Sequence, residues 1–155
     1  MLVREATPAD IDFVVESIRG LARYEKLEHE CEARAGMLER HVFGSPRYAE
    51  ILIGEIDGRR AGYALFFHTY STFLTRPGVY LEDLYVDPGM RRQGLGRALL
   101  TRLASIAVER GCGRLEWAVL DWNEPAIAFY RSIGAVPLAD WTTYRLAGEA
   151  LARLG

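Results

Sequence analysis

The sequence has 155 residues, half of them hydrophobic and 26% charged, with a formal net charge of −2 at pH 7. A chain of this composition can bury a core, so a disordered protein is excluded, and the balanced charge excludes a general nucleic-acid binder with a basic surface. It has only two cysteines, no apolar stretch approaching roughly 18 residues and no apolar run of a signal peptide. We therefore expect one cytoplasmic domain spanning residues 1–155.

The N-terminal third predicts a short strand followed by two helices. Residues 2–4 form the strand, and Thr7 then provides an N-cap, with the acid Asp10 three residues later. Apolar residues recur at helical spacing from there as far as Ala22. A second helix is expected to end at Gly44.

Three strands are expected in the middle of the chain. Residues 48–56 and 61–67 are joined by Asp57-Gly58, a dipeptide typical of a tight hairpin. A loop then leads to a third strand, Val79–Val86.

The C-terminal half predicts alternating helices and strands. A long helix follows a glycine-containing loop and closes at Gly111, and a strand covers residues 115–119. Asn123 begins a helix that ends at Gly134, and Trp141–Leu146 is expected as a last strand before a C-terminal helical turn. This order of elements predicts a mixed α/β fold.

The loop before the long helix predicts a phosphate-binding turn. A helix N-terminus presents N–H groups without acceptors and a partial positive charge, and glycines let an anion approach the backbone. From residue 88 to residue 108 there are four arginines and no acid. A Walker A loop or a dinucleotide-binding loop does not fit, because no Gly-Lys-Ser/Thr follows and the third glycine is missing. A plain turn with solvated arginines remains the alternative.

The pattern Arg91-x-x-Gly94-x-Gly96, placed between a strand and a long helix, resembles the acetyl-CoA signature of the GNAT N-acetyltransferase superfamily. Further segments resemble its diamine (spermidine/spermine) N-acetyltransferase branch, namely residues 21–25, 80–86 and 122–130. The resemblance implies an α/β GNAT fold. Its central sheet is mixed and mostly antiparallel, helices flank the sheet, and acetyl-CoA lies in a cleft between splayed central strands.

The resemblance also assigns the acetyl-CoA contacts. Backbone groups of the strand that ends at Val86 hold the pantetheine arm, and main-chain N–H groups of residues 92–97 hold the pyrophosphate. The implied cofactor-binding residues are Leu84, Tyr85, Val86, Arg91, Arg92, Gln93, Gly94, Leu95, Gly96, Arg97, Asn123, Ala126 and Tyr130.

Two residues are expected to carry the catalysis. An amine must be neutral to attack a thioester, yet a free alkylamine has a pKa near ~10.4. The resemblance favours Glu82 as the base, acting directly or through a water, although adjacent strand residues point to opposite faces and the sequence leaves open whether Glu82 or Asp83 faces the cleft. Tyr130 matches the tyrosine that protonates the departing sulfur; a core tyrosine beside Phe129 is the other interpretation.

Acidic residues indicate a cationic acceptor. Tyr24 and Glu25 match the amine-binding pair of the branch, and Glu82 and Asp140 complete the expected acceptor site. Residues 24–32 contain four glutamates and one lysine, which would concentrate a cation, although a solvated helix end has the same charge pattern. An acidic pair of the branch is reduced here to Asp140, which favours a small amine such as a lysine analogue.

We therefore predict transfer of acetyl from acetyl-CoA to a primary amine of a small di- or polyamine or of a lysine-like compound. Acetylation of a protein N-terminus or lysine, and a CoA-binding regulatory module without turnover, are the alternatives. The three histidines lack metal-ligand spacing, so no metal is expected, nor is a nucleic-acid or membrane partner. The branch forms two-fold dimers, and the apolar stretch Trp141–Leu154 is expected in a homodimer interface.

Overall fold

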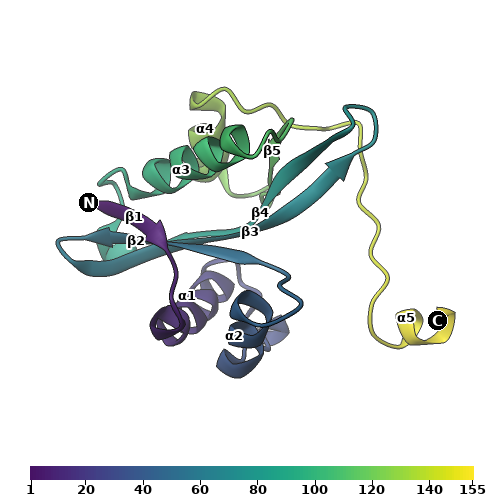
Figure 1. Ribbon diagram of the computed structural model, residues 1–155, viewed down its shortest axis with the longest axis horizontal. Coiled ribbons are helices and arrows are strands. Elements are labelled where there is room, and N and C mark those ends of the chain that lie inside the picture. The colour runs from purple at the N-terminus through teal and green to yellow at the C-terminus, as the bar shows by residue number, and fades with distance from the viewer. The chain divides into compact units, whose positions relative to one another are not determined.

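A sheet with the strand order β1-β2-β3-β4-β5 organises the first part of the chain (Figure 1). The computed structural model describes all 155 residues. All neighbouring strands are antiparallel except β4 and β5, which are parallel. The predicted mixed, mostly antiparallel sheet is thus confirmed. The strands are β1 Leu2–Glu5, β2 Glu50–Ile56, β3 Arg59–Ser71, β4 Arg76–Val86 and β5 Leu115–Glu116.

Helices cover both faces of this sheet. In Figure 1, α1 and α2 lie on one face and α3 on the other. None of the helices is long and apolar enough to cross a membrane. The helices are α1 Ile11–Tyr24, α2 Ala35–Phe43, α3 Leu95–Glu109, α4 Glu124–Ser132 and α5 Gly148–Leu154.

The chain divides into two units, Met1–Ala118 and Val119–Gly155. The first unit contains the sheet with α1, α2 and α3, and the second contains α4 and α5. One domain over residues 1–155 stays a prediction.

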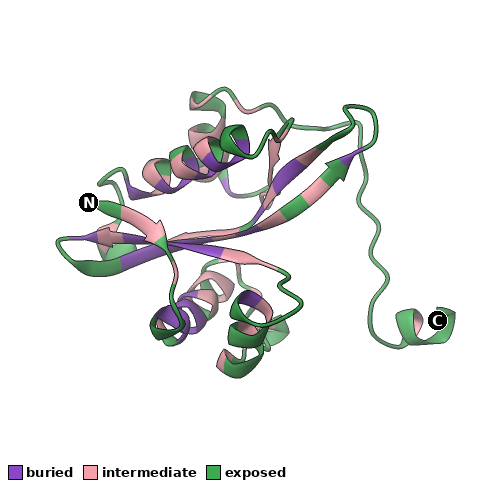
Figure 2. Ribbon diagram, viewed as in Figure 1, coloured by how far each residue is buried: buried purple, intermediate pink, exposed green.

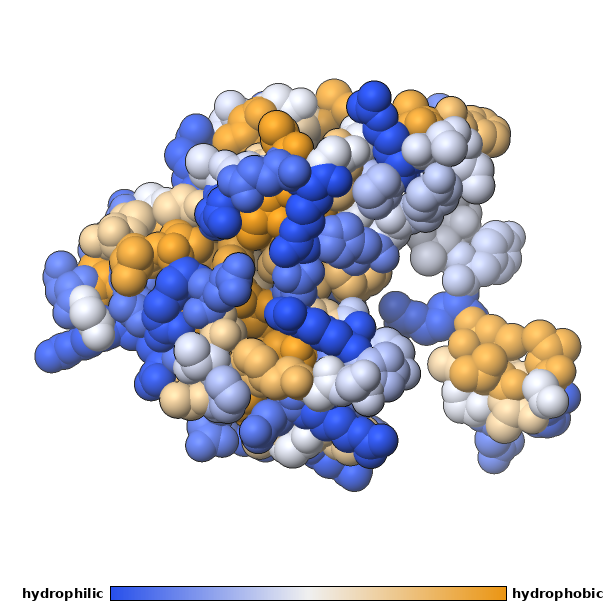
Figure 3. Space-filling model, in the orientation of Figure 1, coloured by the Kyte–Doolittle hydropathy of each residue, from blue (hydrophilic) through white to orange (hydrophobic).

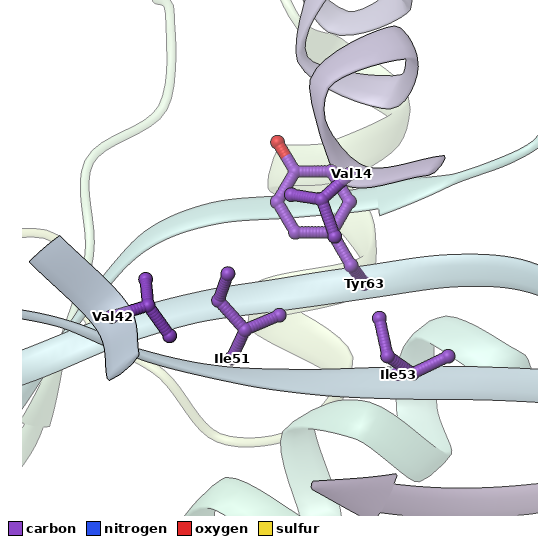
Figure 4. Close-up of a cluster of buried hydrophobic side chains, with 5 residues drawn as sticks. All are labelled: Val14, Val42, Ile51, Ile53 and Tyr63. Carbon is purple, nitrogen blue, oxygen red and sulfur yellow. The ribbon is translucent and has the colours of Figure 1, made fainter. Parts of the chain in front are cut away.

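Two apolar layers bury the sheet of the first unit. Figure 2 shows buried residues along the strands and on the helix faces that meet them. On the face of α1 and α2, a buried cluster consists of Val14, Val42, Ile51, Ile53 and Tyr63 (Figure 4). On the other face α3 buries five large side chains, each worth about 1.5–3 kcal/mol when removed from water. These are Leu95, Leu99, Leu100, Leu103 and Ile106.

The start of α1 follows the predicted capping. A short 3-10 turn, Pro8–Asp10, precedes the helix. The Asp10 carboxylate accepts hydrogen bonds from the Thr7 backbone N–H at 2.8 Å and from the Thr7 hydroxyl at 3.0 Å. These bonds fix where the chain turns from β1 into α1.

The final strand predicted at Trp141–Leu146 is wrong. These residues are exposed and form neither strand nor helix. An isolated strand leaves its N–H and C=O groups without partners, and the sheet has no strand beyond β5 to supply them. The strand predicted at residues 115–119 is likewise limited to Leu115–Glu116.

Candidate active site

The end of β4 has an open edge. β5 pairs with β4 only at Val79 and Tyr80, so β4 continues to Val86 without a strand on that side. β4 and β5 thus lose their pairing beyond Tyr80, which agrees with the splayed central strands that the resemblance implies.

The backbone groups that face this open edge follow from the register of β3 and β4. The Asp87 N–H donates to the Ala61 carbonyl at 2.8 Å, one step beyond the Val86–Gly62 pair. Because hydrogen-bonded and non-hydrogen-bonded pairs alternate in an antiparallel ladder, the N–H and C=O of Val86, and those of Leu84, point away from β3. The same alternation pairs the Tyr85 backbone with β3. Of the three residues predicted to lend backbone groups, only Leu84 and Val86 direct them outward.

A β-bulge at Glu82 separates the two adjacent acids of β4. Leu65 pairs with Asp83 and the next residue of β3, Phe66, pairs with Leu81, so Glu82 is an extra residue in β4. Glu82 is exposed. Asp83 is half-buried, and its carboxylate accepts a hydrogen bond of 2.8 Å from the Tyr63 hydroxyl.

Burial determines the electrostatics around Asp83. It raises the pKa of Asp83, an effect that the Tyr63 hydrogen bond opposes and the nearby Glu82 charge reinforces. Burial and the Asp83 charge likewise raise the pKa of Glu25, the residue that follows α1. Tyr63 is fully buried, and burial together with Asp83 raises its pKa well above 10.0. Glu25 and Asp83 therefore form an acidic pair, in which the Asp83 charge disfavours ionisation of Glu25.

The turn from β4 into α3 has the geometry of an anion site. Gly94 occupies the N-cap of α3 with a φ of +87°, in the left-handed region that favours glycine. The Gly94 carbonyl accepts the Ala98 N–H at 3.0 Å, so the helix begins here and the N–H groups of its first turn have no acceptor within the helix. A Cβ at Gly96 would lie 3.8 Å from its nearest neighbour, an ordinary contact.

Two opposed glycines set the position of the α3 N-terminus. Gly54 of β2 pairs with Gly62 of β3. A Cβ at Gly54 would lie only 2.7 Å from the Leu95 side chain, and one at Gly62 only 2.4 Å from the Tyr85 carbonyl oxygen. The sheet thus lets the first residue of α3 pack directly on its surface, and this contact fixes the position of the turn before α3.

The side chain of Arg91 reaches from this turn to α1. Its Nε donates to the Val86 carbonyl at 3.0 Å, and its guanidinium carbon lies 5.0 Å from the centre of the Tyr24 ring. The first unit therefore brings together Tyr24 and the end of β4, residues more than 60 positions apart in the chain.

Comparison with known proteins decides the family. Residues 15–135 match the Acetyltransferase (GNAT) family. The chain is 35% identical to the thialysine N-epsilon-acetyltransferase of Sus scrofa, over 99% of this chain and 96% of that protein. It belongs to the GNAT family. It is also 30% identical to the spermidine/spermine N(1)-acetyltransferase-like protein 1 of Homo sapiens, over 96% of this chain and 23% of that protein. The family and the branch indicated by the motifs are confirmed.

A solved structure supports the same fold. An integron cassette protein from the mobile metagenome of V. cholerae superimposes with a TM-score of 0.82 and 25% identity, over 99% of this chain and 96% of that one. The GNAT fold predicted from the sequence is confirmed, and the chain is an N-acetyltransferase by family.

The second unit of this GNAT chain carries the remaining predicted site residues. Asn123 is buried and takes the N-cap position of α4, but its side chain makes no capping hydrogen bond. Ala126 and Tyr130 are half-buried residues of α4, and the Tyr130 ring centre lies 5.6 Å from that of Phe129. Asp140 is exposed. The roles of these four residues stay predictions.

Sequence reasoning does not identify Tyr63, and it leaves Asp83 as an alternative to Glu82. The sequence shows Tyr63 only as an apolar residue of a strand, because its partner Asp83 lies 20 positions away. The bulge that turns Asp83 toward Tyr63 has no glycine or other marker in the sequence around it.

Proposed function

We propose that this protein transfers an acetyl group from acetyl-CoA to a primary amine of a small di- or polyamine or a lysine-like compound. The observation that carries the proposal is the acidic pair of Glu25, directly after α1, and Asp83, in β4, which are both partly buried and whose charges interact. Two partly desolvated carboxylates attract a cation strongly, because binding an ammonium relieves their mutual repulsion. The named substrates of the relatives, thialysine and spermidine or spermine, are amines of this kind.

The donor side fits acetyl-CoA. Leu84 and Val86 offer outward-facing backbone groups, which can pair with the amide-containing pantetheine arm much as a neighbouring strand would. Residues 92–97 offer the N-terminus of α3 and its arginines to the pyrophosphate. Bound acetyl-CoA supplies an activated acetyl thioester.

The catalytic roles are assigned to Glu82 and Tyr130. Glu82 accepts the proton of the attacking ammonium, directly or through a water, which suits its exposed position on the bulge. The neutral amine nitrogen bonds to the acetyl carbon, the carbon–sulfur bond breaks, and the Tyr130 hydroxyl gives its proton to the sulfur. The nitrogen loses its second proton as the amide forms, and this proton restores the Tyr130 hydroxyl through solvent. A tyrosine keeps its proton at neutral pH, with an ordinary pKa near ~10. Tyr24 and Glu25 hold the acceptor, and Asp140 completes its site.

The test is an assay of thiol release from acetyl-CoA with lysine, thialysine, spermidine and a lysine-containing peptide as acceptors. Glu25→Gln is expected to raise the KM of the preferred amine by about three- to tenfold at low salt and to flatten its dependence on ionic strength. Glu39→Gln, which removes the same charge from the exposed side of α2, is the matched control.

The assay also separates the alternative functions. Acetylation of the peptide but of no small amine would replace the proposal by a protein acetyltransferase. Binding of acetyl-CoA without turnover on any acceptor would replace it by a regulatory module. An unchanged amine KM in Glu25→Gln would show that the acidic pair is not part of the acceptor site.

The assembly and location belong to the same proposal. Large apolar side chains are exposed throughout the C-terminal stretch, and Trp141 and Tyr144 retain 81% and 92% of their accessible surface. Figure 3 shows hydrophobic surface on the C-terminal helix. We propose that a second copy of the chain covers this stretch in a homodimer. The two free cysteines suit a reducing cytoplasm.

A further inference from the structure

Arg91 contacts two segments to which the proposed function gives different ligands. Its Nε binds the Val86 carbonyl at 3.0 Å, and its guanidinium lies over the Tyr24 ring at 5.0 Å. Val86 belongs to the proposed donor site and Tyr24 to the proposed acceptor site. We propose that Arg91 is a positioning residue that couples the two sites, so that each substrate strengthens the binding of the other; this inference rests on the proposed function.

The first contact fixes the donor side. The Val86 carbonyl is one of the groups that point away from β3 toward the open edge of β4. A carbonyl oxygen has two lone pairs, so the bond from Arg91 leaves it one acceptor position and sets its direction. Any ligand that settles along this edge therefore acts on Arg91 through a shared backbone group.

The second contact fixes the acceptor side. Tyr24 is the last residue of α1, and Glu25 of the acidic pair follows it directly. A guanidinium over an aromatic face contributes about 0.5–1 kcal/mol at an exposed site. This is enough to favour one orientation of the Arg91 side chain. Arg91 thereby limits where the end of α1 can place Glu25.

A third contact holds α1 and β4 together beside Arg91. A Cβ built on Gly20 of α1 would lie 2.8 Å from the Tyr85 hydroxyl oxygen, so this ring of β4 packs directly against the helix backbone. Burial and the Asp87 charge raise the pKa of Tyr85, and the charges of Arg91 and Arg23 oppose this rise, so the Arg91 charge acts on the same ring. The last turn of α1 and the end of β4 are thus joined at two points, and a shift of one carries to the other.

Such a coupling has a defined thermodynamic signature. If the amine strengthens CoA binding by a given factor, CoA strengthens amine binding by the same factor. The rival role for Arg91 is a simple positive charge for the pyrophosphate. Lysine replaces a charge, but it cannot reproduce the planar guanidinium that binds a carbonyl and covers a ring at once.

The experiment measures CoA affinity by calorimetry, with and without the amine preferred in the thiol-release assay. The proteins are wild type, Arg91→Lys, Arg91→Gln and, as control, Arg102→Gln, whose guanidinium pairs with Glu109 at 2.9 Å on the same helix. We expect the wild type and the control to bind CoA about three- to tenfold more tightly with the amine present. In both Arg91 variants this ratio is expected to fall toward one.

A second measurement needs no amine. Hydrogen exchange of the amides of residues 22–27 is expected to slow when CoA binds the wild type and the control, but not when saturating CoA binds either Arg91 variant. Arg91→Lys with wild-type coupling and wild-type protection would overturn the proposal in favour of a simple charge. A wild type in which CoA leaves these amides unchanged would overturn it too.

The two proposals can fail separately. If no amine is acetylated but CoA still protects residues 22–27 through Arg91, the proposed acceptor is wrong while the mechanical link stands. If amines are acetylated and the coupling ratio is the same in all four proteins, the proposed function stands and the role of Arg91 is wrong.

Discussion

At the scale of single residues, the two adjacent acids of β4 have different surroundings. The bulge leaves Glu82 in solvent and turns Asp83 toward Tyr63. One carboxylate is therefore open to water and to a substrate, while its neighbour keeps a fixed place in the fold.

Replacing the half-buried acid Asp83 should make the folded protein more stable and should weaken its binding of the amine. The folded pKa of Asp83 is raised above its ordinary value of 3.8, so the ionised form costs stability once the pH exceeds that value. We expect Asp83→Asn, which keeps an acceptor for Tyr63, to raise Tm at pH 7 by about 1–4 °C and to raise the amine KM. The two melting curves should converge below about pH 4. A lower Tm for the variant at pH 7 would contradict this account.

Replacing Tyr130 by phenylalanine tests whether Tyr130 is a proton donor or only an aromatic ring of the core. Tyr130→Phe removes one hydroxyl and almost no volume, so acetyl-CoA affinity should hold while kcat falls by roughly 10²–10⁴-fold. The loss of kcat in Glu82→Gln, relative to the wild type, should become smaller as the pH rises, because more of the amine is then neutral without the help of a base. Paired pH–rate profiles with Tm values check both. If Tyr130→Phe keeps more than half of the wild-type kcat, the sulfur takes its proton from elsewhere.

At the scale of elements, the turn into α3 tests the donor site. Gly94 needs its positive φ, so a substitution there would disturb folding as well as binding. Gly96 has room for a side chain within the protein. Gly96→Val is therefore expected to fold and to weaken CoA binding at least tenfold, or about 1.4 kcal/mol. Calorimetry measures the CoA affinity of this variant against that of the control Gly36→Val, whose Cβ meets nothing within 4 Å. Equal CoA affinities of the two variants would contradict a phosphate site at this turn.

The sequence predicted the elements whose signals are local. The cap at Thr7, the hairpin at Asp57-Gly58 and the helix after Asn123 all depend on a few neighbouring residues, and the structure has each of them. The strand predicted at Trp141–Leu146 has no partner in the chain, and a strand is stable only when paired. Pairing across the sequence also decides the register that isolates Glu82, which is why the Tyr63–Asp83 bond could not be foreseen.

At the scale of the molecule, one buried acid joins the N-terminal elements. The Asp10 carboxylate is 1% exposed and binds Arg4 at 2.8 Å and Arg60 at 2.6 Å. These contacts link β1, the start of α1 and β3. Breaking them is expected to affect the stability of the first unit as a whole and not its chemistry.

We expect Asp10→Asn to lower the free energy of unfolding by about 1–3 kcal/mol at pH 7, because the buried site loses its charge-assisted hydrogen bonds. The Arg4 hydrogen bond lowers the pKa of Asp10 below its ordinary 3.8, against the opposing effect of burial. This stabilisation is therefore complete above about pH 4 and is lost as the pH falls through the depressed pKa. Urea unfolding from pH 7 to pH 2 should show a steeper acid loss for the wild type than for the variant.

The proposed dimer is tested in solution. Light scattering at micromolar concentration is expected to give twice the chain mass of 17.5 kDa. Trp141→Ala with Tyr144→Ala should shift the protein toward the monomer, because exposed aromatic rings dominate such interfaces. Tyr48→Ala, an exposed ring outside the stretch, is the control. A wild-type mass of 17.5 kDa would overturn the assembly.

The bulge in β4 has a consequence for changes in chain length. Leu65 and Phe66 are consecutive in β3, and their partners Asp83 and Leu81 are separated only by Glu82. Deleting Glu82 would therefore leave every other pair of this ladder in register, whereas a deletion in β4 away from the bulge would shift side chains to the wrong face. Since bulges bend and twist a strand, the shortened β4 should also run straighter, and its last residues should lie closer to β5. A single-residue deletion, usually damaging inside a sheet, is expected here to give a folded protein that lacks both its proposed base and the open edge beside it.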